Sequence, residues 1–128
     1  MPGFIAYRSL LGRFATPALR AAHARALSQV SPPTLTARLR AMADVDVREK
    51  LRAVKVPALY LRATEDLVVS ARFGAEFRQH ARQGTLVDIE GPHLLLQANP
   101  HESVRRIAAF MGTLSPTGAQ APHPPVAP

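Results

Sequence analysis

The sequence predicts an α/β protein, because residues 56–100 combine two strand patterns with a helical pattern between them. The run Val56–Leu61 is apolar without alternation, which is typical of a parallel strand that is covered on both faces. A second run, Thr85–Ile89, follows a segment in which Phe73 and Phe77 share one helical face. We therefore expect a parallel strand–helix–strand unit.

Polar residues follow each predicted strand and are the candidate site residues. Asp66 comes shortly after the first strand, and His93 comes shortly after the second. A right-handed crossover places the carboxyl ends of both strands at one edge of the sheet, where sites of open α/β sheets lie. We therefore expect Asp66 and His93 to converge, as two thirds of a nucleophile–base–acid triad. Glu65 is the neighbouring alternative for the acid.

Two segments carry a family resemblance. VKVPALYLRATEDLVV resembles the strand-plus-acid segment of the α/β-hydrolase superfamily, and VDIEGPHLLLQANP resembles its histidine segment. The resemblance covers residues 45–111 well and the preceding residues loosely. It implies a partial α/β-hydrolase fold, consisting of the last two parallel strands with flanking helices and preceding cap-like helices.

The same resemblance implies roles for the site residues. Asp66 would be the triad acid and His93 the general base. Asp66 is favoured over Glu65 because the family's acid usually precedes a short apolar run such as Leu67–Val69. The complete protein would then hydrolyse an ester, thioester or amide bond of a small-molecule acyl substrate, and the resemblance implies no cofactor.

One departure from the family pattern concerns the nucleophile. The chain contains no G-x-S-x-G motif, and its serines lie outside any strand–Gly–Ser–Gly–helix context; they are Ser9, Ser28, Ser31, Ser70, Ser103 and Ser115. Relatives with an aspartate nucleophile use the same acid–histidine pair, so Ser and Asp both stay open. We expect the isolated chain to be inactive, and to self-associate or pair with a complementary amino-terminal fragment. The alternative function is a non-catalytic remnant or interaction module of the same fold.

The chain divides into three parts. Residues 1–44 are predicted to be a helical, cap-like segment, with one helix from Pro17 to about Gln29 and a second after Ser31. Residues 1–16 permit an Arg-rich targeting segment or a lid helix, and the lid helix is favoured. Residues 45–114 form the strand–helix–strand–helix part. Residues 115–128, rich in Pro, Ala and Gly, are expected to be disordered.

Local signals predict several helix ends. A capping box of Asp46 and Glu49 is expected to start a short helix, and Ser70 to cap the helix that follows the first strand. The sequence 99–102 combines an Asn cap, a first-turn proline and a glutamate that reaches back to the cap. Gly112 is the expected stop.

Two apolar sets near the carboxyl terminus are predicted to be buried. Leu94, Leu95 and Leu96 should support the histidine loop. The last helix carries one stripe that should cover a face of the sheet, formed by Val104, Ile107, Ala108 and Met111.

Composition excludes some functions. The net charge of +7 is mostly scattered arginine without the motif of a nucleic-acid-binding module, so no specific nucleic-acid partner is expected. The absence of cysteine suits a cytoplasmic location, and no run is long enough to span a membrane. No metal site is expected, because the histidines lack paired ligand spacing: His23, His80, His93, His101 and His123. His80 is expected on the exposed side of its helix.

Overall fold

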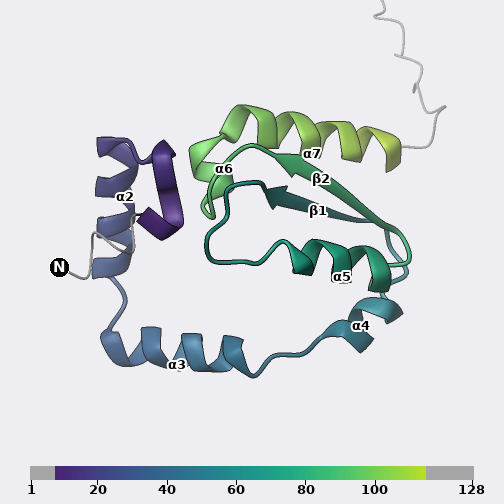
Figure 1. Ribbon diagram of the computed structural model, residues 1–128, viewed down its shortest axis with the longest axis horizontal. Helices are drawn as coiled ribbons and strands as arrows, with labels where there is room; N and C mark the ends of the chain where they lie inside the picture. Colours follow the sequence, from purple (N-terminus) through teal and green to yellow (C-terminus); the bar gives the residue numbers. More distant parts are fainter. Residues whose placement is uncertain (1–7, 115–128) are drawn as a thin grey trace, which may run out of the picture.

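The computed structural model describes residues 8–114, which form a mixed α/β arrangement around one small parallel sheet (Figure 1). Strand β1 spans Ala58–Ala63 and strand β2 spans Gly84–Ile89. They pair in parallel from Ala58 opposite Gly84 to Ala63 opposite Ile89. The expected α/β class and the parallel strand–helix–strand unit are therefore confirmed.

Helix α5, Arg72–His80, crosses between the strands and covers one face of the sheet, while the other face lies toward α7, Pro100–Leu114 (Figure 1). The Tyr60 ring of β1 lies 5.2 Å from the Phe77 ring of α5, between centroids. A methyl group at Gly74 would lie 3.0 Å from Leu86 Cδ1 and 3.1 Å from Arg62 Cδ. Glycine at this position therefore allows α5 to approach the sheet closely.

Helix α7 differs from its sequence prediction. Its fully buried residue is the small Ser103, which is 0% exposed and donates its hydroxyl to the Asn99 carbonyl at 2.7 Å. The predicted core stripe lies largely in solvent, with Val104 63%, Ile107 39% and Met111 56% exposed. The prediction was wrong for this chain because the sheet has two strands and is too narrow to cover a full helix face.

The leucine run after His93 forms the short helix α6, Leu95–Ala98, which precedes α7. Leu95 is buried, Leu94 is partly buried, and Leu96 is mostly exposed. The expectation that all three leucines are buried is therefore met at Leu95 and fails at Leu96. A single turn of helix presents only one of three consecutive side chains to the core.

The two helices before the sheet begin as expected. Helix α2 spans Pro17–Ser28 and is capped by Thr16, and helix α3 spans Pro32–Ala43 and is capped by Ser31, whose hydroxyl accepts from the Thr34 amide at 3.3 Å. Neither helix contains a buried residue. In Figure 1 they form an arm that runs around the sheet with α3 held away from it.

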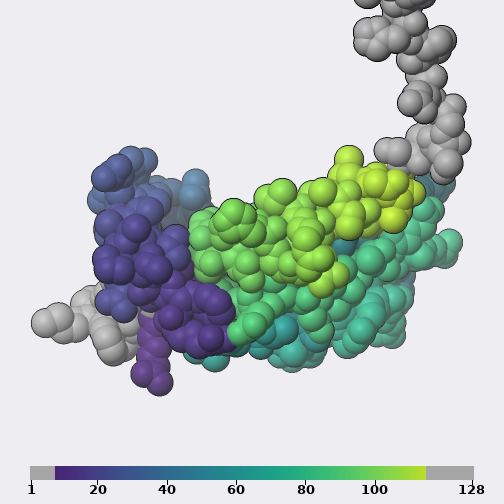
Figure 2. All heavy atoms as spheres, turned by 90° about the horizontal axis from the view of Figure 1, so that it is seen from above, coloured from purple at the N-terminus to yellow at the C-terminus, as the bar shows by residue number. Residues whose placement is uncertain are grey.

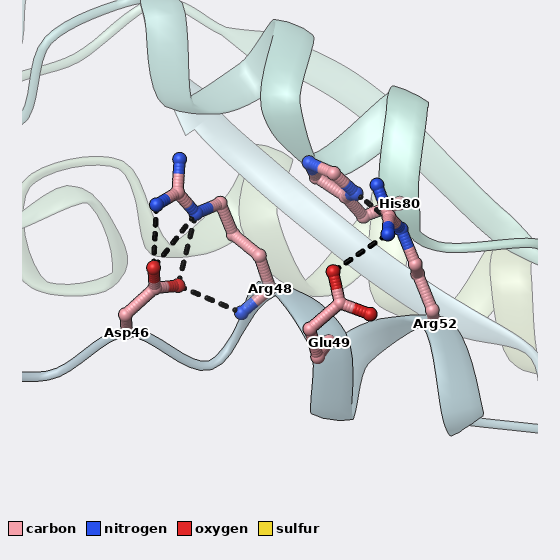
Figure 3. Close-up of polar contacts among 5 residues, drawn as sticks. All are labelled: Asp46, Arg48, Glu49, Arg52 and His80. Atoms are coloured by element: carbon pink, nitrogen blue, oxygen red, sulfur yellow. Dashed lines mark hydrogen bonds and ion pairs between the residues drawn. The ribbon is translucent and has the colours of Figure 1, made fainter.

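Two predicted caps are absent as such. Helix α4, Arg48–Ala53, starts at Val47 without a side-chain cap from that residue; Asp46 accepts from both the amide and the guanidinium of Arg48, and Glu49 pairs with Arg52 (Figure 3). Helix α5 follows Ala71 and likewise has no side-chain cap. The Ser70 hydroxyl accepts only one long bond, of 3.4 Å, from the Arg72 amide.

The last helix begins at Pro100, as predicted, but differs from the prediction at Glu102 and at Gly112. Glu102 binds Arg105 and Arg106 at 2.7 Å instead of reaching back to the cap. The helix continues past Gly112 to Leu114. Glu49 in α4 and Glu102 in α7 bind arginines within one helical turn, because charge-assisted bonds to guanidinium are strong.

The prediction that His80 lies on the exposed side of its helix was wrong. The residue is only 8% exposed. Its Nδ1 accepts a bond of 2.9 Å from Nε of Arg52 in α4, and Arg52 also binds Glu49 (Figure 3). Helix α4 packs on α5 at this point and covers the histidine. The contact joins residues 28 positions apart, so the helical pattern of α5 alone does not reveal it.

Predictions for the chain ends lie outside the described residues. These are the disorder of residues 115–128 and the part of the targeting or lid segment that precedes residue 8. Among the residues that are described, no helix combines the length and the apolar character needed to cross a membrane.

Candidate functional site

Asp66 and His93 meet at the carboxyl ends of the two strands. Nδ1 of His93 lies 3.0 Å from Oδ2 and 3.2 Å from Oδ1 of Asp66. An ionised carboxylate only accepts hydrogen bonds, so Nδ1 carries the proton and the neutral ring keeps a lone pair on Nε2. The convergence expected from the strand–helix–strand topology is present, while the catalytic role of the pair stays a prediction.

The backbone holds the Asp66 carboxylate in place. Its Oδ1 accepts from the amides of Val68 at 2.8 Å and Val69 at 2.9 Å. Burial alone would raise the pKa of Asp66, but the bonds from Val69, His93 and Val68 together lower this pKa below its ordinary value. The Asp66 carboxylate is therefore held as an anion by its backbone and imidazole partners.

Backbone pairing continues beyond the strands and connects the two loops. The Thr64 amide donates to the Ile89 carbonyl at 3.0 Å, and the Glu65 amide donates to the Gly91 carbonyl at 2.9 Å. A methyl group at Gly91 would lie 2.6 Å from Leu95 Cδ1, so glycine here lets the chain pass close to the buried Leu95 side chain. The acid loop and the histidine loop are therefore joined directly to one another.

Glu65, the alternative acid, faces another partner. Its carboxylate accepts from Nε of Arg13 at 3.0 Å and from Nη2 at 2.7 Å. These bonds lower the pKa of Glu65 below its ordinary value. Arg13 also pairs with Glu90, at the end of β2. Of the two neighbouring acids, Asp66 is the one that contacts His93.

Arg13 belongs to residues 8–14, called the strap below, which include the 3-10 helix η1, Gly12–Phe14. Leu11 of the strap is 1% exposed, and the Leu10 carbonyl accepts from the Leu94 amide at 3.0 Å. Figure 2 shows the purple N-terminal residues directly against the green segment that follows β2. The strap therefore contacts both loops that carry the acid–histidine pair.

Sequence reasoning missed the role of the strap. Arg13 pairs with Glu65 across 52 positions and with Glu90 across 77 positions, and no local pattern encodes such distances. The available hint was the presence of an extra acid at each predicted strand end, because two acids at one sheet edge call for a nearby cation.

A cavity of about 200 Å³ adjoins the acid–histidine pair. Its wall includes Tyr60, Asp66, Val69, His93 and Leu95. Within residues 8–114, no hydrogen bond to Nε2 of His93 is formed, and the ring is partly exposed. The lone pair on Nε2 can therefore accept a proton from a group that enters from outside this part of the chain.

The described residues offer no nucleophile to His93. Ser103 is buried in α7 and uses its hydroxyl within that helix, and no described serine forms a hydrogen bond with His93. The same part of the chain contains no group of three His, Cys, Asp or Glu side chains able to hold a metal ion. The arrangement can orient an imidazole as a base, and no nucleophile contacts that base within residues 8–114.

No family model and no curated protein matches this chain. The hydrolase resemblance therefore rests on the residues quoted from the sequence and stays a prediction.

Proposed function

We propose that this chain is the carboxyl-terminal portion of an α/β-fold hydrolase that cleaves ester, thioester or amide bonds in its complete form. Asp66 orients the imidazole of His93, and Nε2 of His93 removes a proton from a nucleophile outside residues 8–114. One observation carries the proposal. A carboxylate fixed by two backbone amides holds Nδ1 of a histidine at 3.0 Å, at the carboxyl ends of adjacent parallel strands.

The chemistry follows the general logic of nucleophile, base and acid. Proton transfer to Nε2 makes the nucleophile reactive, and the imidazolium that forms is stabilised by the Asp66 carboxylate. His93 then returns the proton to the leaving group as the acyl intermediate forms. The oxyanion donors, like the nucleophile, belong to the complete protein, and without them the largest stabilisation of the transition state is missing.

The first experiment is to sequence the DNA that precedes the Met1 codon and to translate every frame. We expect a strand, a G-x-S-x-G turn or its Asp counterpart, and a helix. Expression of the extended chain should then give activity on p-nitrophenyl esters. If no such turn is encoded in any frame, the hydrolase proposal fails and a binding function replaces it.

The extended chain also allows the roles of the pair to be tested. His93→Ala should lower kcat by about 10²–10⁴-fold, which is the usual contribution of a general base. His101→Ala is the matched control, because His101 is exposed on the first turn of α7. Equal activity in the two variants would contradict the assignment of His93.

A second candidate function, an interaction module, is favoured by the exposed surface of α7. Val104, Ile107 and Met111 form an apolar stripe on a helix next to a sheet with two strands. Large exposed apolar surfaces and open strand edges promote association. Light scattering during gel filtration should detect self-association of the isolated chain. A monomer with a sharp two-state melt would contradict this second candidate.

A further inference from the structure

A second cleft lies beside the acid loop, between the strap and the start of α2. Its volume is about 570 Å³ and its wall includes Arg8, Arg13 and Arg20 together with Glu65 and Leu67. This volume falls within the range of small-molecule sites. Three guanidinium groups therefore border a cleft large enough to hold a substrate.

The carboxylates near this cleft leave it with an excess of positive charge. Arg13 is occupied by Glu65 and Glu90, which balance its charge. Among the described residues, no carboxylate forms an ion pair with Arg8 or Arg20. Guanidinium groups bind carboxylates and phosphates through charge-assisted hydrogen bonds, so these two arginines favour an oxyanion.

The arginines of the cleft are carried by structured segments. Arg8 lies in the helical turn of residues 8–11, which buried Leu11 anchors to the protein. Arg20 lies in the first turn of α2, where its amide donates to the carbonyl of the capping residue Thr16 at 3.0 Å. Segments fixed in this way lose little entropy when a ligand binds.

The cleft adjoins the candidate site through the acid loop. Glu65 and Leu67, which line the cleft, are the chain neighbours of Asp66, which lines the smaller cavity with His93. Leu67 is largely exposed and adds an apolar surface on this side of the loop. A molecule bound in the cleft can therefore extend across the acid loop toward His93.

From this arrangement, and resting on the proposed hydrolase function, we propose that Arg8 and Arg20 bind the anionic end of the substrate. The substrate class is then an acyl compound that carries a carboxylate or phosphate group at a distance from the bond that is cleaved. Arg13 has a different task, since its two carboxylate partners make it a link between the strap and the sheet.

Binding to the chain as it exists tests this proposal without any catalysis. Monomethyl succinate is the probe, dimethyl succinate is its neutral counterpart, and inorganic phosphate is the competitor. The amide signals of Gly12, Ala15 and Leu67 report on the cleft in NMR titrations. We expect monomethyl succinate to shift these signals with a millimolar Kd. The Kd of dimethyl succinate should be at least about tenfold higher, because the neutral ester loses a charge-assisted bond.

Two double variants separate a specific site from general positive charge. Arg8→Gln/Arg20→Gln should weaken binding of monomethyl succinate by about tenfold or more. Arg38→Gln/Arg40→Gln removes the same charge from exposed positions on α3 and should change the Kd by less than about twofold, because exposed charges at a distance are screened. All four arginines are exposed, and circular dichroism will verify that both variants keep the fold.

Several results would overturn the proposal: no binding of monomethyl succinate, equal binding of the dimethyl ester, or equal loss in the two double variants. Competition by phosphate would support the oxyanion site and would extend the substrate class to phosphorylated acyl compounds. Failure of this proposal leaves the Asp66–His93 assignment intact, because that assignment depends on activity of the extended chain. Conversely, absence of an upstream nucleophile leaves the binding result unchanged.

Discussion

The arm formed by α2 and α3 and the sheet with its loops differ in what holds them. Each helix of the arm has a side-chain cap and a proline in its first turn, yet neither contains a buried residue. The sheet and its loops lack such caps on α4 and α5, yet they contain most of the buried side chains. Local signals are therefore enough to shape a helix, whereas the candidate site depends on contacts between distant residues.

The largest expected difference between these regions is in the effect of truncating an apolar side chain. Ile89→Ala, at the 2% exposed end of β2, should reduce the free energy of unfolding by about 2–5 kcal/mol. Leu39→Ala, at a 58% exposed position of α3, should change it by less than about 0.5 kcal/mol. Urea denaturation followed by circular dichroism measures both. Similar losses would show that the arm packs as tightly as the sheet.

Removal of the strap's cation should affect the site more than overall stability. Arg13→Ala leaves Glu65 and Glu90 without their shared partner, so the strap should loosen and the loops should lose order. We expect a lower Tm and loss of the downfield proton signal of Nδ1 of His93. Arg13→Lys should retain part of the signal that Arg13→Ala loses, because an ammonium group keeps the charge but cannot form the bidentate contact with Glu65. Arg48→Ala, which breaks an exposed pair with Asp46, is the control.

Acid should weaken the site region through Asp66. The pKa of Asp66 is lowered in the folded chain, so the unfolded chain binds its proton at a higher pH. This contribution is complete above the unfolded pKa of about 3.9 and disappears as the pH falls through the folded pKa. Asp66→Asn should therefore flatten the decline of stability below pH ~4. The free energy of unfolding of both proteins can be measured at successive pH values. The same decline with falling pH in both would contradict the assigned bonds.

The most local effect is expected at a helix cap of the arm. Ser31→Ala removes the bond to the Thr34 amide and should destabilise α3 by about 0.5–2 kcal/mol. Since α3 has no buried residue, fraying of this helix should leave the unfolding of the sheet unchanged. Hydrogen exchange at single amides distinguishes the two regions. A global shift in protection would show that the arm and the sheet unfold together.

The sequence was informative where signals are local or where topology brings residues together. The strands, the starts of α2 and α3, and the meeting of Asp66 with His93 follow from patterns and from the parallel crossover. Three features did not follow from such patterns. Arg52 covers His80, Arg13 joins two distant acids, and the stripe of α7 finds too little sheet to cover.

These exceptions share a physical cause. A periodic pattern states which side of a helix is apolar, but burial also depends on which other element arrives there. For α7 the pattern is present and the covering surface is not. His80 is covered by α4, and the sequence of α4 does not indicate which element it packs against.

The docking of the strap has a consequence for the order of folding. Arg13 reaches Glu90 across 77 positions, so this contact closes one of the longest loops in the chain. The entropy of closing a long loop delays such contacts until local structure has formed. The strand–helix–strand unit is therefore expected to assemble early and the strap to dock late. During synthesis on the ribosome the strap emerges first. It can dock only after β2 and the loop that follows β2 have also emerged.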